Sequence, residues 1–151
     1  MKKPDSLINR NYKKGDLPIL LEQYKTIVES AERITEKRQN TNNFYLAVNS
    51  FILAVASYLT ALKSNLIPIF ISAIGLLISL VWLKNIGSFK SLNSAKFKVI
   101  HELEEYLPAR IYKKEDQYLQ KKYYKLTSVE KFVPIIFGVI YLVMIVISIK
   151  T

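Results

Sequence analysis

The residues best placed to do chemistry lie at 101–105, where the histidine is followed by three glutamates within four positions. On a helix, His101 and Glu105 lie one turn apart, a spacing that can ligate a metal ion. The chain has one histidine, so no second imidazole can complete a His-Glu-x-x-His site. We therefore interpret the segment as the solvated polar face of a helix, and we predict neither a metal site nor a cofactor.

The remaining composition also argues against catalysis. The chain has no cysteine, which excludes disulfides, thiol catalysis and cysteine-ligated metal centres. Its four glycines form no phosphate-binding loop, and no serine lies in a nucleophile-elbow pattern. We predict no catalytic residue and expect that the protein is not an enzyme.

Apolar and charged residues occupy separate blocks, as in a membrane protein with polar extensions. Half of the 151 residues are hydrophobic and 23% are charged. Residues 44–62, 66–83 and 132–149 contain no charged side chain, and each stretch can cross about 30 Å of hydrocarbon as a helix. A soluble domain of this size cannot readily bury three such helices. We predict an all-α integral membrane protein that forms one membrane domain over 1–151, with three transmembrane helices and a cytoplasmic helical bundle continuing from them.

Basic residues predict the orientation of these spans. Nine lie in segment 1–43 and eleven in segment 84–131, whereas the 63–65 hairpin and the C-terminal tail hold one each. The positive-inside rule then places the N-terminus and segment 84–131 in the cytoplasm and the C-terminus outside. We expect a multi-pass protein of the inner (cytoplasmic) membrane.

The net charge of +10 is accounted for by the lipid bilayer as partner. Basic residues lie near the span ends, where anionic head groups sit: Lys37, Arg38, Lys84, Lys90 and Lys131. Binding to nucleic acid is not expected, because no recognised module and no aromatic-interleaved basic loop is visible.

A heptad seam precedes the first span. Its apolar positions alternate at spacings of three and four: Leu17, Leu20, Tyr24, Ile27, Ala31 and Ile34. The seam predicts a cytoplasmic helix of about 25 residues that packs on another helix, as in a coiled coil. An amphipathic helix lying on the membrane is disfavoured, because Glu22, Glu29 and Glu32 would face anionic lipid.

A stripe of small residues runs along the first span, at spacings of four and three: Asn43, Ala47, Ser50, Ala54, Ser57, Ala61 and Ser64. A lesser version in the second span is Gly75-xxx-Ser79. Small side chains let membrane helices approach closely, so the stripe predicts a helix–helix contact. That contact serves either the intramolecular hairpin or an interface between subunits of a homo-oligomer.

Asn49 is the strongest polar group inside the first span, and no span holds Asp, Glu, Lys, Arg or His. Coupled transporters generally need ionisable groups at membrane depth, so coupled transport is disfavoured. Asn49 either bonds a neighbouring helix, which we favour, or lines a pore. Beyond the second span we expect its helix to run on to Leu107-Pro108, followed by a cytoplasmic helix at about 114–124.

Two stretches resemble a family of small bacterial integral membrane proteins. The stretch 38–44 matches Arg-Gln-x-x-Asn-x-Phe/Tyr at the entry to the first span, and 93–104 matches Asn-x-Ala-Lys-Phe-x-Val-Ile-x-Glu-Leu-Glu after the second. The resemblance covers residues 17–149. The layout is also similar to the SLATT class of membrane effectors, which oligomerise and permeabilise membranes in defence systems, although this chain has a third span.

Two hypotheses follow. The first is a homo-oligomeric, pore-forming or gated membrane effector of the defence type. The second is a non-catalytic scaffold or accessory subunit that docks a soluble cytoplasmic partner through its helices.

Overall fold

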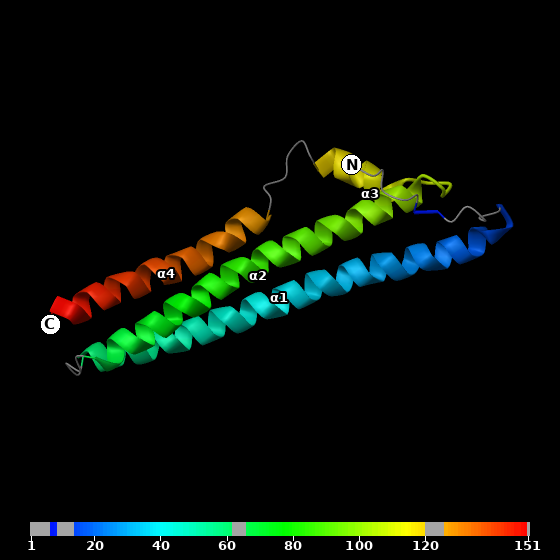
Figure 1. Cartoon of the computed structure of the whole chain (residues 1–151). Coiled ribbons are helices and arrows are strands. Elements are labelled where there is room, and N and C mark those ends of the chain that lie inside the picture. Colours follow the sequence, from blue (N-terminus) through cyan, green and yellow to red (C-terminus); the bar gives the residue numbers. More distant parts are fainter. Residues whose placement is uncertain (1–6, 9–13, 62–65, 120–125, 151) are drawn as a thin grey trace, which may run out of the picture. The chain divides into compact units, whose positions relative to one another are not determined.

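All elements in the described part of the chain are helices. The computed structural model describes residues 7–8, 14–61, 66–119 and 126–150. After a short 3-10 turn at Lys14–Asp16 come α1 (Leu17–Ala61), α2 (Ile67–Glu104), α3 (Ile111–Leu119) and α4 (Leu126–Lys150), labelled in Figure 1. Three of them, α1, α2 and α4, contain stretches long and apolar enough to cross a membrane. The predicted fold class, all-α with three transmembrane helices, is confirmed.

The heptad segment and the first span form one continuous helix, α1, of 45 residues. After Pro18, which occupies the first turn, α1 contains neither proline nor glycine that would interrupt the backbone hydrogen bonds. The second span likewise continues as α2 for 38 residues.

The end of α2 differs slightly from the expectation. Its α-helix stops at Glu104, and the next three amide groups bond carbonyls three residues back, as Tyr106 N does to Leu103 O at 3.0 Å. Such tightening is common where a helix ends, and here Pro108 follows. The next helix, α3, covers 111–119 rather than 114–124, and residues 120–124 lie outside the described part.

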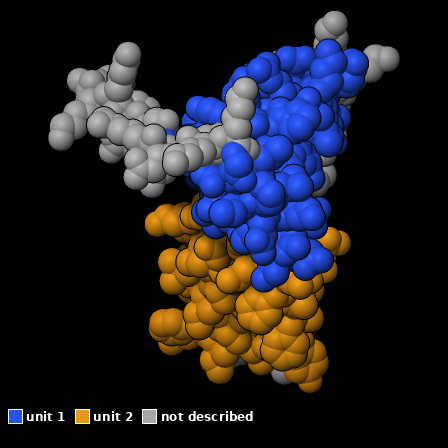
Figure 2. Space-filling view, turned by 90° about the vertical axis from the view of Figure 1, so that its right-hand side faces the viewer, with its two compact units in different colours: residues 1–36, 91–123 blue, residues 37–90, 124–151 orange. Residues whose placement is uncertain are grey.

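The residues pack into two compact units, coloured separately in Figure 2. Unit 1 comprises residues 1–36 and 91–123, and unit 2 comprises 37–90 and 124–151. The buried apolar residues of unit 1 are Leu20, Ala31, Ile100 and Leu103. Those of unit 2 are Ala56, Trp82, Ile86 and Tyr141. The apolar segments of all three long helices belong to unit 2.

Candidate functional site

A cluster of hydrogen bonds around Asn49 joins the three helices of unit 2. The Asn49 side chain is fully buried. Its Oδ1 accepts a hydrogen bond from Ser79 Oγ of α2 at 2.9 Å, and its Nδ2 donates to the carbonyl of Tyr45 at 2.8 Å. From α4, Tyr141 Oη donates to the backbone carbonyl of Asn49 at 2.8 Å. In the single chain, Asn49 thus bonds neighbouring helices, and lining a pore would require it to leave these partners.

Gly75 makes room for the ring of Tyr141. A Cβ atom added at Gly75 would lie 2.3 Å from Tyr141 Cζ, far inside van der Waals contact. Ser79, one turn along, shares its hydroxyl hydrogen between Asn49 Oδ1 and the Gly75 carbonyl, 3.0 Å away. Both Gly75 and Ser79 are buried. The small pair predicted in the second span therefore lies where α4 approaches α2, an arrangement that small residues permit in membrane helices.

Aromatic rings extend from this cluster along unit 2. The rings of Tyr45 and Trp82 stack at 5.7 Å with an interplanar angle of 12°. Phe137 of α4 lies 6.4 Å from Trp82 and 6.3 Å from Tyr141, measured between ring centroids. The polar ends of these rings are also bonded: Trp82 Nε1 donates to Asn42 at 2.9 Å, and Asn85 donates to the Tyr45 hydroxyl at 2.7 Å. The rings and bonds connect the same three helices as the Asn49 cluster.

The stripe of small residues on α1 lies on a different face from this cluster. Its described members are exposed in the single chain: Asn43, Ala47, Ser50, Ala54, Ser57 and Ala61. The last predicted member, Ser64, lies outside the described residues. The hairpin packs instead through Asn49 and Ala56, which are both buried. The buried contacts of the hairpin thus use a different face of α1 from the stripe, which is exposed in the single chain.

The heptad seam packs within unit 1. Leu20 and Ala31 are buried, whereas Tyr24, Ile27 and Ile34 are half-buried. Two contacts pair this part of α1 with α2: Tyr24 Oη donates to Glu104 at 3.0 Å, and Lys96 Nζ donates to Ser30 Oγ. The seam thus packs partly on the chain's own second helix, whereas Leu17 is exposed and Ile27 also lines the groove described below.

The segment 101–105 was wrongly interpreted as a uniformly solvated face. Glu102 and Glu105 are exposed, but Glu104 is fully buried. Its carboxylate accepts hydrogen bonds from the backbone amides of Tyr112 at 2.7 Å and Lys113 at 2.9 Å, besides that from Tyr24. The local sequence at 101–105 carries no sign of this burial. The three groups that donate to Glu104 lie 8, 9 and 80 positions away from it in the chain.

The electrostatics around Glu104 follow from these contacts. Burial, and then the hydrogen bond to the carboxylate, raise the pKa of the Tyr24 hydroxyl. Burial also raises the pKa of Tyr112. On the exposed side, the hydrogen bond from Lys113 lowers the pKa of Glu105, which also pairs with Arg110 at 2.7 Å. Within the described residues, no three histidine, aspartate or glutamate side chains converge on a position for a metal ion.

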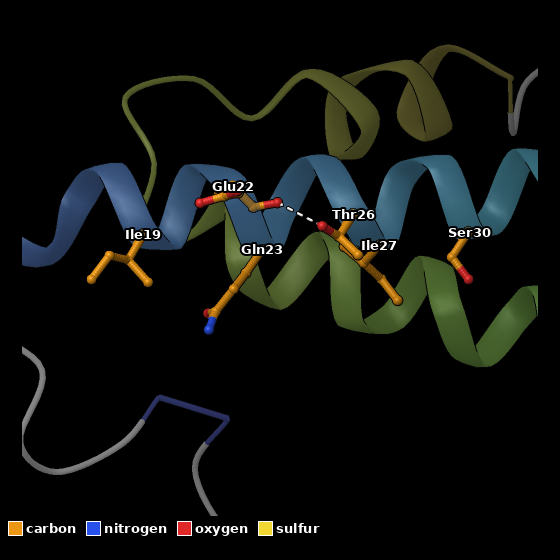
Figure 3. A pocket seen from close by; sticks show the side chains of 6 residues that line it. All are labelled: Ile19, Glu22, Gln23, Thr26, Ile27 and Ser30. Atoms are coloured by element: carbon orange, nitrogen blue, oxygen red, sulfur yellow. Dashed lines mark hydrogen bonds between the residues drawn. The ribbon is translucent and has the colours of Figure 1, made fainter.

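An open groove lies along α1 in unit 1 (Figure 3). It is lined by Ile19, Glu22, Gln23, Thr26, Ile27 and Ser30. Thr26 Oγ1 donates a hydrogen bond to the backbone carbonyl of Glu22 at 3.0 Å, so one polar group of the groove already has a partner within α1. The groove offers a mixed apolar and polar surface.

Comparison with known proteins gives one family. The model of the octameric membrane protein family (8xMP) matches residues 21–150, which include the small-residue stripe, the Asn49 cluster and Glu104. No curated protein and no solved structure matches the chain.

Proposed function

The chain belongs to the octameric membrane protein family, and from this membership we propose that it forms a homo-octameric ring in the membrane that surrounds a pore. The single observation that carries the proposal is the exposure of the small-residue stripe on α1. Lipid is as apolar as the side chains of a membrane helix, so helices associate there chiefly by close approach. An exposed face of alanine and serine on a span provides that approach to a second copy.

The geometry of a closed octamer supports a central pore. Head-to-tail contacts between identical subunits form a ring when the rotation from one subunit to the next closes, as it does in a closed octamer. If each subunit places one helix in the inner layer, at interaxial distances of about 8–10 Å, the ring leaves an opening about 10–16 Å across. No span carries a charged residue, so the opening would be lined by apolar and hydroxyl groups and would discriminate little between ions.

The orientation that we propose has the N-terminus and segment 84–131 in the cytoplasm and the C-terminus outside the inner membrane. The basic residues support it. The role of a gated defence effector rests on the similarity of layout to SLATT proteins. A reporter fused to the C-terminus should read as extracytoplasmic, and one inserted after Lys113 as cytoplasmic; the opposite pair of results would exclude this topology.

A scaffold that docks a soluble partner is the second candidate. The open groove at Ile19 and Ile27 favours it, because a helix of a partner protein could lie against this surface (Figure 3). A scaffold would form an assembly without conducting ions, so reconstitution of the purified protein into liposomes separates the two functions.

The test combines assembly and conductance. Ser50→Leu and Ala54→Leu both increase hydrophobicity, so both variants should insert into the membrane, but the larger side chains should hold neighbouring backbones apart. Native mass spectrometry of nanodisc samples should show octamers for the wild type and smaller species for both variants, with dye release from liposomes lost in parallel. Val139→Leu, at an exposed position of α4, is the matched control and should remain octameric. Octamers in both stripe variants would exclude this interface, and octamers that release no dye would exclude the pore.

A further inference from the structure

The short helix α3 has little apolar packing of its own. None of its described residues is buried, and Ile111 and Tyr118 are 63% and 71% exposed. The Tyr112 ring makes the clearest apolar contacts, lying 5.9 Å from Phe97 and 6.5 Å from Tyr24 between ring centroids. A helix of nine residues is also too short to be stable alone in water. Partial burial of the Tyr112 ring alone is not enough to hold α3 in place, so a polar contact must add to it.

The carboxylate of Glu104 supplies that hold. The first amide groups of a helix have no acceptor within it, and a side-chain oxygen usually provides one. Here the acceptor comes from the last residue of α2, which bonds the amides of Tyr112 and Lys113 in the first turn of α3. Hydrogen bonds to an ionised acceptor are the stronger kind. The neighbouring pairs of Glu105 with Arg110 and Lys113 are exposed and contribute little.

The α1–α2 pair of unit 1 does not depend on α3 for its own core. Leu20 and Ala31 of α1 and Ile100 and Leu103 of α2 are the buried apolar residues, and α3 contributes none. Tyr24 holds the Glu104 carboxylate from α1, so the acceptor remains positioned even without α3. The pair can therefore persist when α3 leaves.

We propose that α3 is a releasable clasp, docked on the α1–α2 pair through Glu104 and able to detach while that pair stays folded. Detachment uncovers the rings of Phe97 and Tyr24. It also adds the nine residues of α3 to the connection between α2 and α4. The clasp gives the protein a local switch in unit 1, and it does not depend on the proposed pore.

Hydrogen–deuterium exchange of the full chain in nanodiscs tests the clasp. Glu104→Gln keeps the shape of the side chain but leaves one carbonyl acceptor for three donors, and its amide NH2 group is itself a donor. We expect exchange in 111–119 to become about tenfold faster or more, with exchange in α1 and in 91–103 of α2 unchanged. Glu102→Gln, at an exposed position two residues away, is the control and should exchange like the wild type.

A second variant covers the case in which the amide disrupts unit 1. Glu104→Asp keeps the charge but shortens the reach by one methylene, so exchange should again rise in 111–119 alone. Two results would overturn the proposal. One is exchange in 111–119 that does not change in either variant. The other is an equal rise in α1 and α2 in both variants, which would make Glu104 a part of the common core rather than a clasp.

Discussion

Units 1 and 2 are both built on α1 and α2, yet they bury different polar groups. Unit 2 buries the neutral side chains of Asn49, Ser72, Ser79 and Ser148 and joins three helices through amide and hydroxyl hydrogen bonds. Among the residues of unit 1 that the structure describes, a single carboxylate is buried, that of Glu104. This difference in buried polar groups matches the surroundings that each segment suits, which are lipid for the apolar stretches of unit 2 and water for unit 1.

In an apolar solvent, hydrophobic burial cannot drive helices together, and a charge is costly. The apolar stretches in unit 2 accordingly pack through close approach at Gly75 and through neutral hydrogen bonds. In water, burial of the apolar heptad seam drives the helices together. A carboxylate that accepts three hydrogen bonds can then be buried beside the seam. One pair of helices thus uses two packing rules along its length.

The largest effect should come from removing an apolar side chain in unit 1. Ile100 is fully buried, and Ile100→Ala should destabilise this unit by about 2–5 kcal/mol through lost burial and the cavity that remains. Hydrogen exchange resolved by segment should show the loss in 17–36 and 91–104. Leu92→Ala, where the leucine is 48% exposed, should change stability by less than about 0.5 kcal/mol. Equal loss of protection in 44–61 would break the distinction between the units.

Crowding at Gly75 should come next. Gly75→Ala forces Tyr141 off its position, and overpacking costs about 1–3 kcal/mol. Gly87→Ala in the same helix meets nothing within 4 Å and should be neutral or stabilising by up to about 1 kcal/mol through helix propensity. Unfolding by SDS titration, followed by circular dichroism, compares the two. Equal stability of both variants would show that α4 does not approach α2 at this point.

A smaller effect is expected from one hydroxyl in unit 2. Tyr141→Phe removes the hydrogen bond to the Asn49 carbonyl and leaves the ring in place. Hydrogen bonds between membrane helices contribute about 0.6 kcal/mol on average, and the same SDS titration should show a loss of this size. A loss of several kcal/mol would contradict this expectation, because it would mean that the stability of unit 2 depends mainly on its polar hydrogen bonds.

The smallest effect concerns pH and unit 1. The pKa of Tyr24 is raised in the folded protein by burial and by the hydrogen bond to Glu104. The stabilisation is therefore fully present below the unfolded tyrosine pKa of about 10 and is lost as pH rises above it. Between pH 9 and 11 the melting temperature of the wild type should fall more steeply than that of Tyr24→Phe. Tyr118→Phe, at an exposed position, is the control and should show the same dependence of melting temperature on pH as the wild type. If the melting temperatures of the wild type and Tyr24→Phe fall in parallel, the raised pKa of Tyr24 is contradicted.

The long helices could be predicted well from the sequence, because charge-free and mostly apolar runs of eighteen or nineteen residues are typical of helices that cross a membrane. The apolar spacing also identified residues such as Leu20 and Ala31, which are buried. The face that α1 presents to its hairpin partner was harder to predict. The small stripe at Ala54 and the polar position at Asn49 lie on different faces of one helix, and both patterns are compatible with packing.

The partner residues in two contacts could not be predicted from the sequence. Gly75 was predicted to lie at a helix contact, but Tyr141, which packs over it, lies far away in the chain and is ordinary in a membrane helix. The burial of Glu104 depends on the turn after α2 returning the chain so that the first amides of α3 face the carboxylate. Both contacts arise from tertiary geometry, which local periodicity does not describe.

The position of Trp82 has an optical consequence. It is the only tryptophan in the chain, it is 3% exposed, and its neighbours Tyr45 and Phe137 come from α1 and α4. Its fluorescence therefore reports on all three helices of unit 2 without any added dye. Separation of α4 would admit water or lipid to the indole and shift its emission, so assembly of the unit can be followed in real time in liposomes that contain the purified protein.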